Sequence, residues 1–84
     1  MSMTMRERRQ RGLTLRNLVK VSRQLKESGE LTSDMPRDEM AELILEAVVA
    51  EDPKAFAEVG LDWDAILAFI EKLLPIILTI ISLF

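Results

Sequence analysis

The amino-acid sequence predicts an all-α protein, a small helical domain of three main helices plus a short connecting helix, with a long and apolar last helix. Apolar residues recur with helical spacing in three segments, and glycine, proline and aspartate residues separate these segments. No stretch of useful length alternates apolar and polar residues as a strand does. A chain of 84 residues has room for one small domain at most.

The N-terminal segment, residues 1–12, is polar and rich in arginine, and it predicts a basic flexible arm. A single helical domain is expected to follow over residues 13–84. Its first helix is predicted over about residues 13–28, because apolar side chains recur there close to the i, i+3, i+4, i+7 pattern. Gly29 suits the left-handed position that commonly ends a helix.

The second helix is predicted over about residues 35–51. Pro36 suits its first turn, since proline lacks only an N–H that has no partner there. Three short polar residues before it are candidate N-caps: Thr32, Ser33 and Asp34.

The pair Asp52 and Pro53 predicts a stop followed by a new start, and so a short connecting helix over about residues 53–59. The last helix is predicted over about residues 62–84, with Asp62 as its N-cap. Trp63 is then placed to pack back on the connecting helix.

The last predicted helix has an unusually wide apolar side. Its less apolar residues after Ala65 share one side of the helix: Glu71, Lys72, Pro75, Thr79 and Ser82. A helix at the surface of a globular protein needs an apolar sector of roughly 100°, and this helix exceeds that. One neighbouring helix from so small a chain cannot cover it, so the sequence predicts association with a partner.

Self-association is the first interpretation of this apolar side, because part of it follows a near-heptad series rich in isoleucine. The predicted oligomer or membrane interface comprises ten residues: Ile66, Phe69, Ile70, Leu73, Ile76, Ile77, Ile80, Ile81, Leu83 and Phe84. The protein is therefore expected to be a homo-oligomer or a subunit of a larger assembly. A virion component of viral or phage type would suit this layout.

A membrane-associated protein with an interfacial or spanning C-terminal helix is the alternative interpretation. Twenty helical residues reach about 30 Å, the thickness of the hydrocarbon layer. Glu71 and Lys72 argue against a clean span, because charges inside the hydrocarbon layer are costly. An interfacial helix beside an anionic membrane surface is easier to sustain. A monomer core is the third interpretation, but it would leave an exposed apolar patch.

Charge is distributed unevenly along the chain. Residues 1–26 carry eight basic residues and one acidic residue, whereas residues 27–84 carry three basic and thirteen acidic residues. Arginine binds phosphates and carboxylates with a two-pronged geometry. The predicted polyanion contact comprises Arg6, Arg8, Arg9, Arg11 and Arg16. No aromatic residue lies among them to stack on bases, so nucleic-acid contact would be non-specific and salt-dependent. Pairing with acidic residues of a neighbouring copy is equally consistent with the sequence.

The sequence predicts no enzyme. Histidine, cysteine and tyrosine are absent, and no glycine-rich phosphate loop is present. We therefore expect no catalytic residue, no cofactor, no metal site and no small-molecule substrate. No secretory signal pattern is visible, so an intracellular location is expected, with a membrane surface or a virion as further locations. The predicted function is that of a non-enzymatic structural or interaction protein.

Overall fold

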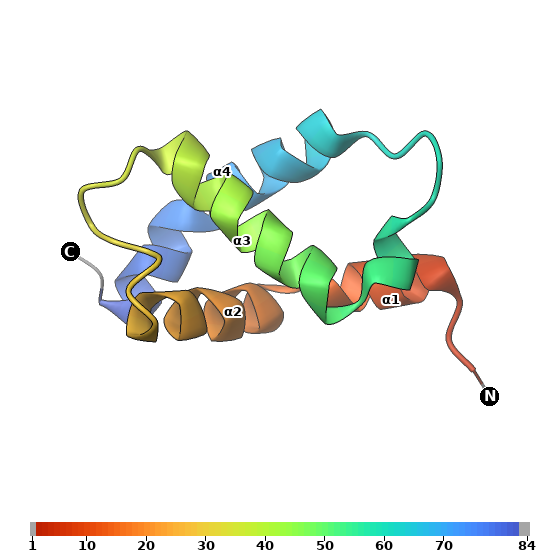
Figure 1. Ribbon diagram of the computed structural model, residues 1–84, viewed down its shortest axis with the longest axis horizontal. Helices are drawn as coiled ribbons and strands as arrows, with labels where there is room; N and C mark the ends of the chain where they lie inside the picture. Colours follow the sequence, from red (N-terminus) through yellow and green to blue (C-terminus); the bar gives the residue numbers. More distant parts are fainter. Residues whose placement is uncertain (1, 83–84) are drawn as a thin grey trace.

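The computed structural model describes residues 2–82, and these residues form an all-helical fold (Figure 1). The all-α part of the predicted fold class is therefore confirmed. The elements are, in chain order, α1 (Met5–Gly12), α2 (Leu15–Glu27), α3 (Arg37–Glu51), the 3-10 helix η1 (Pro53–Phe56) and α4 (Trp63–Ile81). Helices α2, α3 and α4 pack against one another, and α1 packs on η1 at one end of the molecule.

Helix α1 replaces much of the flexible arm predicted over residues 1–12. Thr4 caps it, since its hydroxyl oxygen accepts a hydrogen bond from the backbone N–H of Glu7 at 3.1 Å. At its other end, a Cβ added to Gly12 would lie 3.3 Å from Cγ1 of Val48 in α3. A side chain at this position would therefore require Val48 to move by a few tenths of an ångström. This segment contacts residues that are distant in the sequence. A local sequence pattern does not reveal such contacts.

Helix α2 occupies residues Leu15–Glu27, slightly less than the predicted range. Thr14 caps its start by accepting a hydrogen bond from the backbone N–H of Asn17 at 3.3 Å. Gly29 follows its C-terminal end with a φ of 83°, in the left-handed region that the sequence assigned to it.

Helix α3 begins at Arg37 without the predicted side-chain cap. Pro36 is its N-cap residue, and no side chain accepts a hydrogen bond from the first turn. The hydroxyl of Thr32 instead donates to Oδ1 of Asp34 at 2.6 Å, which lowers the pKa of that carboxyl. Asp38 supplies negative charge to the first turn, where the helix dipole favours it.

The connecting helix is shorter than predicted, because η1 ends at Phe56 and residues 57–62 form a loop. Asp62 caps α4 as expected, accepting a hydrogen bond from the backbone N–H of Ala65 at 3.0 Å. Trp63 stacks on Phe56 with ring centroids 6.3 Å apart. Helix α4 ends at Ile81, and the last part of its predicted range, residues 83 and 84, lies outside the described residues.

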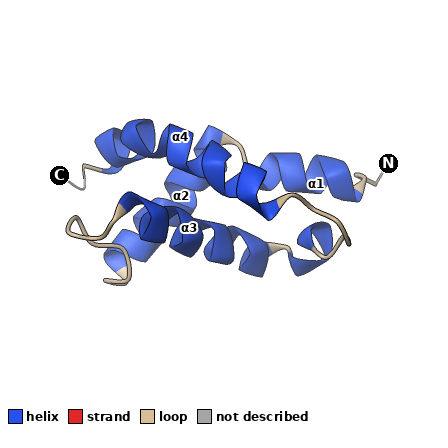
Figure 2. Ribbon diagram, turned by 90° about the horizontal axis from the view of Figure 1, so that it is seen from above, coloured by secondary structure: helices blue, strands red, loops and turns tan. Residues whose placement is uncertain are grey.

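The core lies where α2, α3 and α4 meet, and Figure 2 shows α3 and α4 on opposite sides of the molecule in a view from above. Each of these helices turns one apolar side inward. The largest fully buried apolar side chains are Leu18, Val21, Leu31, Met40, Ile44, Val48, Ile70, Leu74, Ile77 and Leu78. This arrangement leaves the rest of each helix to solvent, and on α4 the remainder is not all polar.

Candidate functional site

Helix α4 presents a row of exposed apolar side chains, which we call the outer seam: Ile66, Phe69, Leu73, Ile76 and Ile80. Phe69, Ile76 and Ile80 are 43%, 48% and 46% exposed, and Ile66 and Leu73 are half-buried. Successive members are alternately three and four residues apart, which places all five along one side of the helix. This spacing is typical of helix sides that pack against another helix.

A second apolar row, the inner seam, faces the protein's own core: Ile70, Leu74, Ile77, Leu78 and Ile81. The exposed residues Phe69, Ile76 and Ile80 are each followed directly by a buried residue of this row. Successive residues of a helix lie about 100° apart, so the two rows occupy neighbouring sectors. Helix α4 thus uses one sector for folding and leaves the next one uncovered.

The inner seam corrects part of the predicted interface. Ile70, Ile77 and Ile81 were expected to meet a partner, but α2 and α3 bury them, with 0%, 0% and 5% exposure. The outer seam retains the other five predicted residues within the described part of the chain. Leu83 and Phe84 lie outside the described residues.

The polar stripe of α4 lies on the surface. Glu71, Pro75, Thr79 and Ser82 are all exposed. The Thr79 hydroxyl donates to the carbonyl oxygen of Pro75 at 2.7 Å, and the helix continues through this proline. The outer seam is therefore bounded by polar residues on one side and by the inner seam on the other.

Helix α2 lies beside the outer seam and runs in the same direction as α4. At their C-terminal ends, Nζ of Lys26 donates to the carbonyl oxygens of Ile81 and Ser82 at 2.9 and 3.2 Å. At their N-terminal ends, Leu13 lines an apolar hollow together with Ile66 and Phe69. The seam therefore follows the junction of two parallel helices.

A groove at this junction contains residues that the sequence did not single out. Leu15, which is 37% exposed, and the half-buried Val19 line it together with Ile80. Four cations also line it, against a single carboxylate from Glu27: Arg11, Arg16, Lys20 and Arg23. Leu15 and Val19 belong to the apolar pattern that predicts this helix, and the pattern does not show which of its residues lie at the surface. Their place at the edge of that pattern is the one signal that separates them from the core.

The predicted polyanion contact is divided by the fold. Arg8 binds both carboxylate oxygens of Asp52, and Arg9 donates to the carbonyl oxygen of Ala55 at 2.9 Å and pairs with Glu58 at 2.8 Å. These two arginines hold α1 against η1, which corrects their prediction as ligands for an outside partner. The other predicted members remain exposed: Arg6, Arg11 and Arg16.

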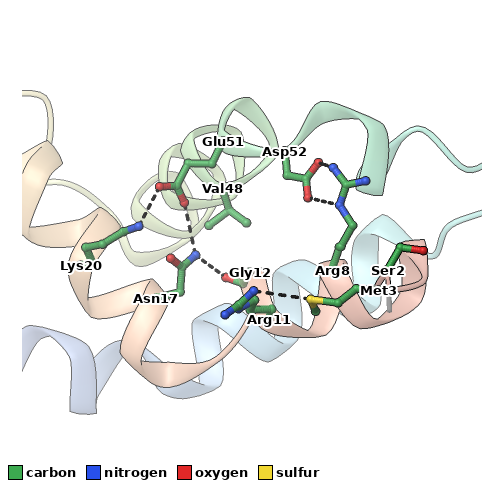
Figure 3. A pocket seen from close by; sticks show the side chains of 10 residues that line it. All are labelled: Ser2, Met3, Arg8, Arg11, Gly12, Asn17, Lys20, Val48, Glu51 and Asp52. Atoms are coloured by element: carbon green, nitrogen blue, oxygen red, sulfur yellow. Dashed lines mark hydrogen bonds and ion pairs between the residues drawn. The ribbon is translucent and has the colours of Figure 1, made fainter.

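The pairs around Asp52 belong to a charged pocket where α1, α2 and α3 meet (Figure 3). Glu51 pairs with Nζ of Lys20 at 3.0 Å and accepts a hydrogen bond from Nδ2 of Asn17 at 3.3 Å. The hydrogen bond from Arg8 lowers the pKa of Asp52, against a smaller opposing effect of burial. Carboxylates and cations thus partner each other across the pocket, which makes it a junction between helices.

Two further properties of residues 2–82 bear on function. No group of three or more acidic side chains there is arranged to hold a metal ion. No helix there combines the length and apolar character needed to cross a bilayer.

Comparison with protein-family models, with curated proteins and with solved structures finds no match to this chain.

Proposed function

We propose that the protein is a non-enzymatic assembly protein and that its copies associate through the outer seam of α4. The observation that carries this proposal is the alternation along α4, where Phe69, Ile76 and Ile80 are nearly half exposed while their sequence neighbours fill the core. The hydrophobic effect favours removing such a row from water. Heptad spacing with isoleucine suits packing against a second helix.

A second copy of this chain is the partner that the surface fits best. An interface of standard size removes about 800 Å² from each partner. The described chain exposes 5552 Å², so such an interface would use about one seventh of it. The α2–α4 side of this three-helix arrangement can supply an area of that order. The regular spacing of three and four residues along the outer seam also suits a facing helix better than a flat lipid surface.

The exposed arginines complete the proposal. Arg6 and Arg11 have no carboxylate partner within residues 2–82, so they remain free to contact an acidic or phosphate-bearing molecule. Such contact would be generic and salt-dependent, because phosphate binding by arginine carries no sequence information.

Sedimentation equilibrium in buffer without detergent tests the association. We expect the wild-type protein to form a discrete oligomer whose population rises with concentration. The double variant Ile76→Lys with Ile80→Lys should be monomeric, because buried charges without partners are costly. Ala68→Lys is the matched control, since Ala68 is exposed on α4 outside both seams. It should leave the size unchanged.

Circular dichroism should show the same helix content in all three proteins. A wild-type protein that stays monomeric at every concentration, or a double variant of unchanged size, would overturn the proposal. Recovery of the protein only on anionic vesicles would overturn it too, in favour of a membrane-surface function.

A further inference from the structure

The surface around the outer seam is asymmetric, because α2 lies along only one of its sides. Lys26 joins the C-terminal ends of α2 and α4, and Leu13 lies with Phe69 at their N-terminal ends. Leu15 and Val19 extend the apolar surface from the seam onto α2. A partner seated on the seam would therefore touch both helices.

The α2 side of this surface is strongly basic. Arg11, Arg16 and Arg23 line the groove, and none of them forms an ion pair within residues 2–82. Four acidic residues of α3 are exposed and do not line this groove: Asp38, Glu39, Glu42 and Glu46. The outer seam itself has no charged member. Lys72 is its nearest charged neighbour by helical spacing, three residues after Phe69 and four before Ile76.

Two symmetric arrangements bring both α2 and α4 of one copy against both of these helices in the other copy. A two-fold axis perpendicular to α4 stacks α4 on α4 and α2 on α2, with the stacked helices antiparallel. A two-fold axis along α4 stacks α2 of each copy on α4 of the other, with all four helices parallel.

Electrostatics separates the two arrangements. The first brings the arginines of one α2 against those of the other, and like charges repel more strongly when an interface excludes water. The second places the arginines over an apolar row whose nearest charged neighbour on α4 is Lys72. The charge on α2 therefore disfavours the antiparallel arrangement.

Building on the association proposed above, we propose that α2 of each copy covers the outer seam of the other copy, so that the two α4 helices run parallel. Leu15 and Val19 supply apolar contacts to the seam. The aliphatic stems of Arg16 and Arg23 lie on the same apolar surface, while their guanidinium groups reach solvent at the rim. Both outer seams are buried in this arrangement, and the two basic α2 helices do not face each other.

Fluorescence energy transfer between copies tests this arrangement. The chain contains no cysteine, so single variants such as Glu30→Cys and Asp64→Cys can be labelled at one position each. Both residues are exposed, and neither belongs to a seam. The loop after α2 and the first turn of α4 lie toward opposite ends of a molecule 40 Å long (Figure 1).

Donor-labelled Glu30→Cys protein is mixed with acceptor-labelled protein of either kind. The parallel arrangement predicts more transfer between residue 30 of both copies than between residue 30 of one copy and residue 64 of the other. The reverse order would overturn the arrangement while leaving the association intact. A sedimentation result of three or more copies would also overturn it. A protein that stays monomeric in the same mixtures would instead refute the proposed function.

Discussion

Arg8 in α1 and Asp52 after α3 lie 44 residues apart in sequence and form a two-point ion pair (Figure 3). Nε of Arg8 donates to Oδ2 of Asp52 at 2.8 Å, and a second guanidinium nitrogen donates to Oδ1. This pair holds the N-terminal helix on the end of α3. An arginine that the sequence suggests for an outside polyanion is thereby used inside the fold.

The Arg8–Asp52 pair predicts a loss of stability in acid. The pKa of Asp52 is lowered in the folded protein, so its contribution is fully present above the unfolded value of about 3.9. As the pH falls further, through the lowered folded pKa, that contribution is lost. The free energy of unfolding, measured by chemical denaturation, should therefore differ between wild type and Asp52→Asn at about pH 6. This difference should narrow as the pH falls to about 2. Arg8→Gln should give the same narrowing, and a gap independent of pH would contradict the pair.

Ser22 predicts a stabilising substitution. It is fully buried, and its hydroxyl oxygen has no hydrogen-bond partner within residues 2–82. Removing an unsatisfied buried hydroxyl recovers its desolvation cost, so Ser22→Ala should raise the free energy of unfolding by about 1 kcal/mol. Ser28→Ala is the control, because the Ser28 hydroxyl donates to the carbonyl of Leu25 at 3.0 Å. Thermal and chemical denaturation measure the stability of both variants. A loss of stability in Ser22→Ala would show that the Ser22 hydroxyl has a hydrogen-bond partner.

The two seams of α4 predict opposite outcomes for two adjacent isoleucines. Ile77 is fully buried and Ile76 is 48% exposed. Ile77→Ala should lower the free energy of unfolding by about 2–5 kcal/mol, because it leaves a cavity in the core. Ile76→Ala should change it by less than about 0.5 kcal/mol under monomeric conditions. In the oligomer, Ile76→Ala should weaken association. Similar effects of both substitutions on the monomer would contradict the separation of the seams.

Substitution of Gly29 measures the energetic cost of a left-handed backbone conformation in the absence of a steric clash. Its φ is 83°, and no atom would lie within 4 Å of an added Cβ. Its N–H donates to the carbonyl of Lys26 at 3.1 Å, which closes the end of α2. Gly29→Ala should therefore lower the free energy of unfolding by about 1 kcal/mol through backbone conformation alone. Glu30→Ala tests the neighbouring position and should be close to neutral. Equal stability of Gly29→Ala and wild type would contradict the expected strain.

The local signals in the sequence predicted the local structure well. Asp62 accepts the hydrogen bond expected of a cap, and Gly29 takes the expected left-handed conformation. Both depend on interactions within a few residues, which a sequence displays directly. The predicted caps of α3 failed because another local interaction competes with capping. The hydroxyl of Thr32 donates to Asp34, and no side chain caps the helix.

The candidate site was predicted only in outline. Helical periodicity shows that α4 is apolar over a wide arc, but it does not show which part of that arc the neighbouring helices cover. Ile76 and Ile77 are equally apolar in sequence, and only the positions of α2 and α3 make one of them surface and the other core. The groove beside Ile80 likewise requires α2 to lie parallel to α4.

By itself, then, the sequence predicted the all-α class, the approximate positions of α2, α3 and α4, and the separation of basic from acidic residues along the chain. Periodicity and charge are properties of neighbouring residues, so they can be recognised from the sequence without knowledge of the fold. The tertiary structure alone decided that α1 is ordered, that Arg8 and Arg9 are used internally, and that the outer seam faces out. Each of these depends on contacts between residues far apart in the chain, and packing chooses among partners that the sequence leaves equivalent.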